Sequence, residues 1–264
     1  MKTVIMFAVL RLSRLSVRFA DRVVVENVDL AVGPGESVGL IGGSGSGKTL
    51  TALAVLGLLP DAAHAGGSIL VDGVDLCGAP ERRLRRLRGS RIGFVGQDAL
   101  AALNPLATVG RQLSIPLRRH RGLSRRQAGH VTAELLSRVG LPAGTGKAYP
   151  AQLSGGQRQR VAIALAAAGR PGLLIADEPT SALDPPTQAG ILALLRDLPP
   201  ADGGALPALL LISHDLAVVS QVCTRLAVMH AGRLVEQGDT AEVIASPRHP
   251  YTRELVASAR ELAA

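Results

Sequence analysis

Aromatic residues are the scarcest class in this chain: its 264 residues include no Trp, three Phe and two Tyr, or 2% in all. A platform that binds nucleic acid by base stacking needs several aromatic side chains, so this composition argues against one. Hydrophobic residues nonetheless make up 47% of the chain, and its length allows a substantial core. That core must be built from Leu, Val, Ile and Ala.

Cysteine is also scarce. Cys77 and Cys223 are far apart in the sequence, and neither belongs to a pattern with metal-ligand spacing. We therefore expect buried thiols in a reducing compartment.

Long apolar runs are missing as well. No run approaches the roughly eighteen residues that a helix needs to span a bilayer. The run from Val4 to Leu10 is shorter still, and no small-residue cleavage site follows it as in a signal peptide. We expect a soluble chain whose association with a membrane comes through a partner.

Acidic residues are outnumbered by basic ones, 21 to 29, which gives a net charge of +8 and a pI of about 10.6. A basic surface attracts nucleic acid, anionic lipid headgroups or acidic partners alike. An arginine-rich solvated face accounts for the same charge without any partner. We favour that simpler interpretation, particularly for the basic segment 81–88.

A glycine-rich stretch is the most informative feature that is present. It consists of Gly42, Gly43, Ser44, Gly45, Ser46, Gly47, Lys48 and Thr49. The pattern Gly-x-x-x-x-Gly-Lys-[Ser/Thr] is typical of a loop that cradles the phosphates of a nucleoside triphosphate. A flexible glycine-serine loop is the alternative. The buried strand expected at 37–41 and the helix expected at 50–59 favour the phosphate loop.

A strand, loop and helix in this order direct backbone N–H groups and the positive end of the helix dipole at one spot. Glycines let the backbone close around a phosphate without Cβ clashes. Lys48 would then reach the β- and γ-phosphates, and the hydroxyl of Thr49 would hold Mg²⁺.

Strands and helices alternate along most of the chain, which predicts an α/β fold with a parallel sheet. The apolar runs 173–176 and 209–212 are typical of parallel strands covered on both faces. Residues 99–150 differ, because they contain four prolines and no obvious strand, and we expect a mostly helical insert there. Further strands are expected within 10–40, at 66–76 around an Asp72-Gly73 hairpin turn, and at 92–95. Helices are expected at 81–88, 124–139, 159–168 and 187–198. A loop is expected at 199–204.

Polar residues follow the expected strands at their ends. They are Lys48, Gln97, Asp177, Glu178 and His214. Ligands of an open parallel sheet bind beyond the carboxyl ends of its strands, so we expect these side chains at one edge. Asp177 is placed to hold Mg²⁺, Glu178 to accept a proton from an attacking water, and His214 to contact the γ-phosphate or that water. A simple strand-to-turn junction at 177–179 and a structural histidine are the plainer alternatives.

A second glycine-rich element opens another expected helix. It consists of Leu153, Ser154, Gly155, Gly156 and Gln157. An ordinary helix start capped by Ser154 is one interpretation, and a second anion site built from backbone N–H groups is the other. One chain needs no second phosphate site, but a composite site shared by two subunits would use both loops.

With these motifs together, the chain resembles the nucleotide-binding subunits of ATP-binding-cassette (ABC) transporters over nearly its whole length. Residues 153–157 match the signature of that family. The resemblance implies a P-loop NTPase fold with a RecA-like core, an antiparallel β subdomain and an inserted helical subdomain. It implies one nucleotide-binding domain over 1–264, divided into the core with its β subdomain at 1–98 and 169–245, the helical subdomain at 99–168 and a C-terminal tail at 246–264.

The resemblance also implies roles for single residues. Phe19 falls where the family stacks an aromatic ring on adenine. Gln97 falls at the Q-loop, which contacts Mg²⁺ and the attacking water, and Asp184 ends the D-loop 181–184. Glu178 matches the catalytic glutamate and His214 the switch histidine. ATP and Mg²⁺ are the implied ligands, and two subunits would enclose two ATP molecules head to tail.

Three short segments resemble the peptide and nickel importers of this family: 104–110, Tyr149-Pro150, and 249–253 with its His-Pro-Tyr-Thr-Arg sequence. Gly43 departs from them, since many of these subunits have Glu there. The implied partners are two transmembrane permeases, a second ATPase subunit that is a paralogue and an extracytoplasmic solute-binding protein, with no nucleic acid. The implied location is the cytoplasmic face of the cell membrane.

Two other functions remain open from the sequence. A soluble cassette acting on DNA or ribosomes is supported only by the basic pI. Its DNA-repair relatives separate the two glycine motifs by long inserts, whereas Lys48 and Ser154 are 106 positions apart here. Its translation relatives carry two cassettes. An exporter ATPase is disfavoured by the His-Pro-Tyr-Thr segment.

Overall fold

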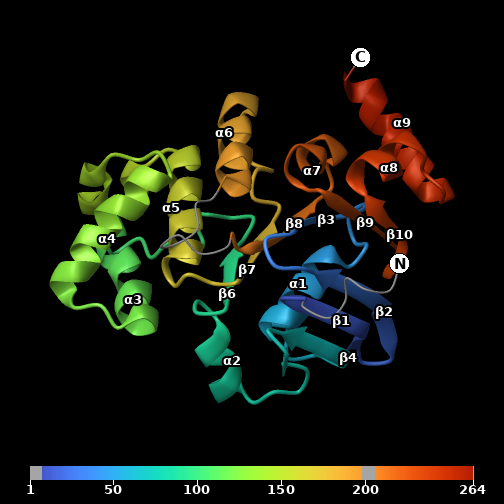
Figure 1. Cartoon of the computed structure of the whole chain (residues 1–264), viewed down its shortest axis with the longest axis horizontal. Coiled ribbons are helices and arrows are strands. Elements are labelled where there is room, and N and C mark those ends of the chain that lie inside the picture. Colours follow the sequence, from blue (N-terminus) through green and yellow to red (C-terminus); the bar gives the residue numbers. More distant parts are fainter. Residues whose placement is uncertain (1–7, 198–205, 264) are drawn as a thin grey trace. The chain divides into compact units, whose positions relative to one another are not determined.

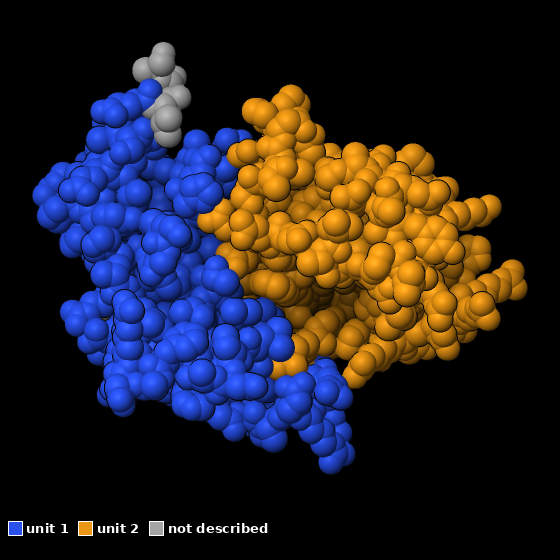
Figure 2. Space-filling view, turned by 180° about the vertical axis from the view of Figure 1, so that it is seen from behind, with its two compact units in different colours: residues 1–86, 208–264 blue, residues 87–207 orange. Residues whose placement is uncertain are grey.

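The computed structural model describes residues 8–197 and 206–263. Figure 1 shows their helices and strands, and Figure 2 shows in different colours the two compact units that they form, each described separately below. Unit 1 comprises residues 1–86 and 208–264, and unit 2 comprises residues 87–207. The loop expected at 199–204, and Leu198 of the expected helix 187–198, lie outside the described residues.

An antiparallel sheet forms the first part of unit 1 (Figure 1). In its first strand Leu10 and Leu12 are buried, and after an irregularity at Arg14 so are Leu15 and Val17, all at most 2% exposed, which is the pattern of a strand with one buried face. The hairpin at Asp72-Gly73 is confirmed, because Val71 pairs with Val74 across two residues of positive φ. The strands, in the order β2-β1-β4-β5, are β1 (Leu10–Phe19), β2 (Arg22–Val32), β4 (Ala63–Val71) and β5 (Val74–Asp75).

A mainly parallel sheet forms the second part of unit 1. Strand β3 (Ser37–Ile41) lies between β8 (Ala208–Ser213) and β9 (Arg225–His230), parallel to both. All six residues of β8 are buried, as expected for a strand covered on both faces. An antiparallel strand, β10 (Arg233–Asp239), pairs with β9. The helices of this unit are α1 (Lys48–Leu56), α2 (Glu81–Leu87), which ends at the unit boundary, α7 (Leu216–Val222), α8 (Thr240–Ala245) and α9 (Pro250–Ala263).

Helix α1 begins and ends earlier than the apolar spacing predicts. Gly47 precedes it with φ 104°, and Gly57 ends it with φ 61°. The N–H of Gly57 donates to Ala54 O and the N–H of Leu58 donates to Leu53 O, a left-handed C-terminal cap. Leu58 therefore lies beyond the helix, although it continues the apolar periodicity.

Unit 2 contains a parallel strand pair and several helices (Figure 1). Strands β6 (Ile92–Val95) and β7 (Leu173–Asp177) pair in parallel, with Ile92 opposite Leu173. Leu117, Ala128 and Ala168 form a buried cluster that joins three of the helices. The elements are α3 (Val109–Arg121), α4 (Arg125–Arg138), the short 3-10 helices η2 (Ala143–Lys147) and η3 (Pro150–Gln152), α5 (Gly155–Ala168) and α6 (Pro185–Arg196).

Two features of unit 2 differ from the sequence prediction. Helix α3 lies within the insert 99–150, which we expected to be mostly helical, but the sequence located only the helix at 124–139 there, and Pro116 lies inside α3. The Thr108 cap and the buried stripe of Val109, Leu113 and Leu117 outweigh the hydrogen bond that a proline cannot make. Helix α5 begins at Gly155, before the apolar run expected as a helix at 159–168, because Ser154 and Gln157 cap it, as one interpretation of the second glycine-rich element predicts.

Within 8–197 and 206–263, no helix combines the length and the apolar character that crossing a bilayer would require.

Candidate nucleotide-binding site

The glycine-rich loop of unit 1 follows β3 and opens α1, as predicted. Gly45 and Gly47 have φ of 74° and 104°, in the region that favours glycine. A Cβ on Gly42 would lie 2.1 Å from the backbone oxygen of Met229, so the loop passes directly against the end of β9. Gly45 and Gly47 favour glycine through their backbone conformation and Gly42 through the lack of space, as in a loop that wraps closely around a ligand.

Lys48 is held over this loop. Its side chain is only 6% exposed, and Nζ donates to the carbonyl oxygens of Gly42 and Gly43 at 2.7 and 2.9 Å. Helix α1 has no acidic residue in its first turn and no side-chain cap, so its own side chains do not neutralise the positive end of its dipole. Thr49 is exposed in that first turn. The arrangement offers a fixed cation and a helix N-terminus to an anion.

His214 lies at the same sheet edge as the loop. Strand β8 is the parallel neighbour of β3, and Ser213 is in register with Ile41. His214 and Gly42 are therefore the next residues of adjacent strands, and the histidine is exposed. Phe19 belongs to the antiparallel sheet of the same unit, where it ends β1 opposite Ala63 and is half-buried.

The carboxylates and the glutamine of unit 2 share an edge in the same way. Ala176 of β7 is in register with Val95 of β6, so Asp177 and Gln97 follow closely on paired residues. Asp177 is 5% exposed, whereas Gln97 is exposed.

Glu178 has a strained backbone. Its φ is +50°, and holding a residue other than glycine in this region costs on the order of 1–3 kcal/mol. Its carbonyl oxygen accepts from the hydroxyl of Ser181 at 3.2 Å, which braces the turn. This turn therefore fixes the backbone from which the half-buried Glu178 side chain projects.

The second glycine-rich element forms the N-terminus of α5. Ser154 Oγ accepts from the N–H of Gln157 at 3.3 Å, and Gln157 Oε1 accepts from the N–H of Ser154 at 2.9 Å, a complete capping box. A Cβ on Gly156 would lie 2.4 Å from Thr187 Cγ2 of α6, so the helices approach too closely for a larger residue. Leu153 is buried, while Ser154 and Gly155 are exposed. This end of a 14-residue helix is open to an anion.

Asp184 precedes α6 and acts as its cap. Its carboxylate accepts from the N–H of Thr187 at 3.0 Å, and this hydrogen bond holds the pKa of the exposed Asp184 carboxyl below its usual value. The segment 181–184 lies beside the signature element, since a Cβ on Gly155 would lie 3.6 Å from Leu183.

The predicted site residues are thus found in two groups. Unit 1 brings Lys48 and His214 to one strand edge, and unit 2 brings Gln97, Asp177 and Glu178 to another. Their gathering at a single edge stays a prediction.

One contact of the loop was missed by the sequence analysis. The N–H of Gly43 donates to the hydroxyl oxygen of Tyr251 in α9 at 2.7 Å. The two residues are 208 positions apart, and no local pattern links them. The sequence indicated a resemblance to importers for the His-Pro-Tyr-Thr segment but no contact with the loop.

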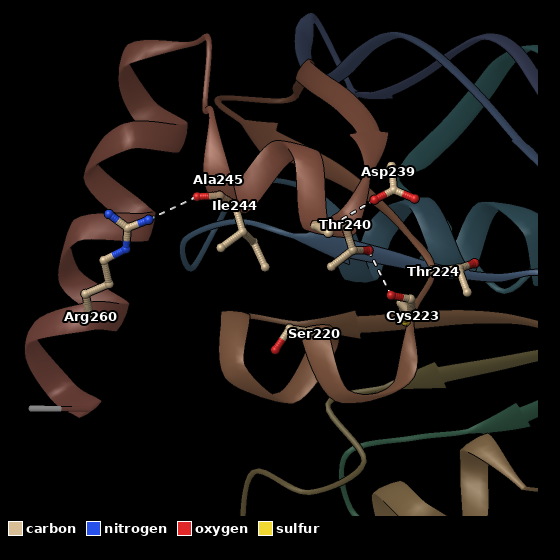
Figure 3. A pocket seen from close by; sticks show the side chains of 9 residues that line it. Ser220, Cys223, Thr224, Asp239, Thr240, Ile244, Ala245 and Arg260 are labelled. Atoms are coloured by element: carbon tan, nitrogen blue, oxygen red, sulfur yellow. Dashed lines mark hydrogen bonds between the residues drawn. The ribbon is translucent and has the colours of Figure 1, made fainter.

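A cavity of about 640 Å³ elsewhere in unit 1 contains none of the predicted site residues (Figure 3). Asp239 caps α8, the hydroxyl of Thr240 donates to Cys223 O at 2.8 Å, and Arg260 donates to Ile244 O at 3.3 Å. Burial raises the pKa of the Cys223 thiol to about 12, which keeps it unreactive. The polar groups around this cavity thus serve the fold, and Cys223 is the buried thiol that we expected, while Cys77 is only half-buried.

The parallel sheet, the glycine loop and the lysine together define a P-loop nucleoside triphosphatase. The model of the ABC transporter family matches residues 25–181, and the chain belongs to that family. It is an ABC ATPase cassette with the α/β fold that the sequence predicted.

Named relatives and solved structures agree with this family. The chain is 47% identical over 252 residues to a putative peptide import ATP-binding protein of Brucella ovis, covering 91% of this chain and 73% of the relative. It is 45% identical over 241 residues to the probable D,D-dipeptide transport ATP-binding protein DdpD of Escherichia coli, covering 90% and 73%.

Two solved structures are similar to the whole fold. A dimeric post-hydrolysis state of the ATP-binding cassette MJ0796 bound to ADP and Pi matches with a TM-score of 0.75 and 29% identity, covering 88% of this chain and 98% of that one. CbiO1 of Clostridium perfringens, part of an ABC transporter complex, matches with a TM-score of 0.78 and 28% identity, covering 91% and 92%.

Proposed function

We propose that this chain is the ATP-hydrolysing subunit of an importer for peptides or for nickel and other metal chelates. The observation that carries the proposal is the phosphate loop, with Lys48 fixed over it and a helix N-terminus behind it. The importer assignment is supported by relatives named for peptide and dipeptide import at 45–47% identity. Because these relatives are transport subunits, transport is favoured over action on DNA or ribosomes.

ATP would bind with its phosphates on the loop 42–49. Lys48 would neutralise the β- and γ-phosphates, and the backbone N–H groups at the start of α1 would bind their oxygens. The ring of Phe19 would stack on adenine. The role of Phe19 follows from its position in the family pattern, and its half-buried place at the end of β1 leaves part of the ring accessible.

Three side chains would hold Mg²⁺. Thr49, Gln97 and Asp177 offer hydroxyl, amide and carboxylate oxygens, the donor types that this hard cation prefers. The ion would offset the negative charge of the β- and γ-phosphates.

Glu178 would accept the proton of the attacking water, and His214 and Gln97 would orient that water and the γ-phosphate. The turn in which the carbonyl oxygen of Glu178 accepts from the Ser181 hydroxyl fixes the backbone that carries this carboxylate.

Hydrolysis would need a second cassette. The exposed N-terminus of α5, with Leu153, Ser154, Gly155, Gly156 and Gln157, would bind the ATP held by the loop of a partner subunit, and Asp184 would lie in the same interface. The head-to-tail arrangement gives each of the two glycine elements a phosphate.

The remaining partners follow from the importer assignment. Two transmembrane permeases would hold the ATPase pair at the cytoplasmic face of the membrane, and an extracytoplasmic binding protein would deliver the solute. The second ATPase would be a paralogue, and no nucleic acid would take part. We also propose the subdomain division given above, with the core and β subdomain at 1–98 and 169–245, the helical subdomain at 99–168 and the tail at 246–264.

The ATPase activity of the complex purified with its permeases tests this function. We expect hydrolysis that depends on Mg²⁺ and is stimulated when the solute-loaded binding protein is added. The importer assignment would be contradicted if the complex bound Mg-ATP but its rate of ATP hydrolysis did not change with any of the peptide or nickel-chelate mixtures.

A further inference from the structure

Tyr251 reaches the phosphate loop from the C-terminal helix. It is the second residue of α9, and its hydroxyl oxygen accepts from the N–H of Gly43 at 2.7 Å. The carbonyl of the same Gly43 accepts from Lys48 Nζ at 2.9 Å. Lys48 Nζ also donates to Gly42 O at 2.7 Å, so the peptide group between Gly42 and Gly43 is held through its N–H by α9 and through its carbonyl by the phosphate-binding lysine.

The tyrosine ring is itself fixed in place. It packs on the ring of His230 with centroids 4.0 Å apart and an angle of 32° between the planes. His230 ends β9, which is the parallel neighbour of the strand that feeds the loop. The sheet that carries the loop therefore also holds the tyrosine ring, through His230.

The start of α9 is anchored as well. The carboxylate of Glu236 on β10 accepts from the N–H groups of Arg248 and His249, both at 2.9 Å. The N–H of Tyr251 donates to Nδ1 of His249 at 3.2 Å. These bonds fix the backbone from which the tyrosine projects, so its hydroxyl is a rigid part of the loop's surroundings.

We propose that Tyr251 is a positioning residue of the ATP site, which sets the loop through Gly43 and makes ATP affinity depend on helix α9. The inference rests on the proposed ATPase function. Without the hydroxyl, Gly43 loses its acceptor and the peptide that supports Lys48 is held on one side only. The expected loss is in binding, because the hydroxyl of Tyr251 bonds to the phosphate loop itself.

A substitution at Gly43 can test the same contact independently, through steric crowding. A Cβ on Gly43 would lie 3.1 Å from the hydroxyl oxygen of Tyr251, closer than ordinary van der Waals contact. Since the ring and the helix start are both anchored, the hydroxyl has little freedom to move away. Alanine at position 43 should therefore disturb the loop when Tyr251 is present and much less when the hydroxyl is absent.

The test is a double-mutant cycle on ATP affinity. Tyr251→Phe, Gly43→Ala and the double variant are made in the full chain carrying Glu178→Gln, and the Kd for Mg-ATP is measured by calorimetry. We expect each single change to raise Kd about two- to tenfold, the range for one net hydrogen bond, and the double variant to bind more tightly than the product of the two effects predicts. In complexes with Glu178 intact, KM should rise and kcat at saturating ATP should stay within about twofold.

Matched controls separate the contact from the substitution. Tyr149→Phe removes the hydroxyl of the other tyrosine, and Gly66→Ala adds a Cβ where no atom lies within 4 Å. Both should leave Kd unchanged. Equal Kd values for Tyr251→Phe and Tyr149→Phe, or strictly multiplicative effects at positions 43 and 251, would overturn the inference while ATP binding stands. Failure of the unaltered loop to bind Mg-ATP would instead overturn the ATPase function itself, and the inference with it.

Discussion

Individual glycines determine whether the phosphate loop can form. Gly42 faces the backbone oxygen of Met229, and Gly47 faces the side chains of Met229 and Val25, all within 3 Å of where a Cβ would lie. The first contact is with backbone, which cannot rotate away as a side chain can. The pattern Gly-x-x-x-x-Gly-Lys therefore records steric limits of this fold as well as the chemistry of phosphate binding.

Gly42→Ala should distort the loop and weaken Mg-ATP binding at least tenfold, and we expect it to lower the free energy of unfolding by about 1–3 kcal/mol. Calorimetric binding and denaturant unfolding of the full chain measure both effects. Gly66→Ala, whose Cβ meets nothing within 4 Å, serves as the control. Wild-type affinity in Gly42→Ala would show that the loop does not close as tightly as we describe.

Glu178 gives the second prediction at the level of a residue. Glu178→Gln keeps the shape of the side chain and removes the base, so the complex should still bind Mg-ATP but lose turnover by about 10²–10⁴-fold. Single-turnover hydrolysis in the assembled complex measures this loss, with Glu254→Gln on the exposed face of α9 as the control. Near-normal turnover would refute the assignment of Glu178 as the base.

Elements were predictable where local chemistry defines them. The strand ending at Ile41, the strand 92–95 and the hairpin at Asp72-Gly73 follow from apolar runs and turn residues, and the structure contains them. Helix α3 was covered only by the expectation of a helical insert at 99–150. Its bounds follow from the Thr108 cap and a packed stripe of apolar residues, which stabilise it although Pro116 lies inside. Contacts between distant segments, such as Gly43 with Tyr251, leave no local trace at all.

Two serine capping boxes of unit 2 allow a test at the scale of the helix. Ser124 caps α4 and Ser154 caps α5 with the same hydrogen-bond distances, 2.9 and 3.3 Å. Ser124→Ala and Ser154→Ala should each cost about 1 kcal/mol of stability. Only Ser154→Ala should also reduce ATP hydrolysis by the assembled complex.

Binding of ATP to the isolated chain should be unaffected in both alanine variants, because the signature element would contact the ATP of the partner subunit. Denaturant unfolding, calorimetry and steady-state hydrolysis together separate these effects. If both variants lowered hydrolysis equally, the signature element would have no role beyond capping its helix.

At the scale of the whole molecule, the proposed function gives the chain half of each of two ATP sites. Its phosphate loop and its signature element are separate features with their own helix N-termini, at α1 and α5, and each suits an anion. A single subunit would leave one of them without a phosphate. Head-to-tail pairing of two cassettes explains why one chain carries both.

If this chain powers an importer, it should be recovered from membranes together with its partners. The tagged Glu178→Gln chain would be purified with Mg-ATP from detergent-solubilised native membranes, and every protein that accompanies it would be identified by mass spectrometry. We expect two permeases and a second cassette subunit. Recovery of ribosomal or DNA-associated proteins alone would contradict the account.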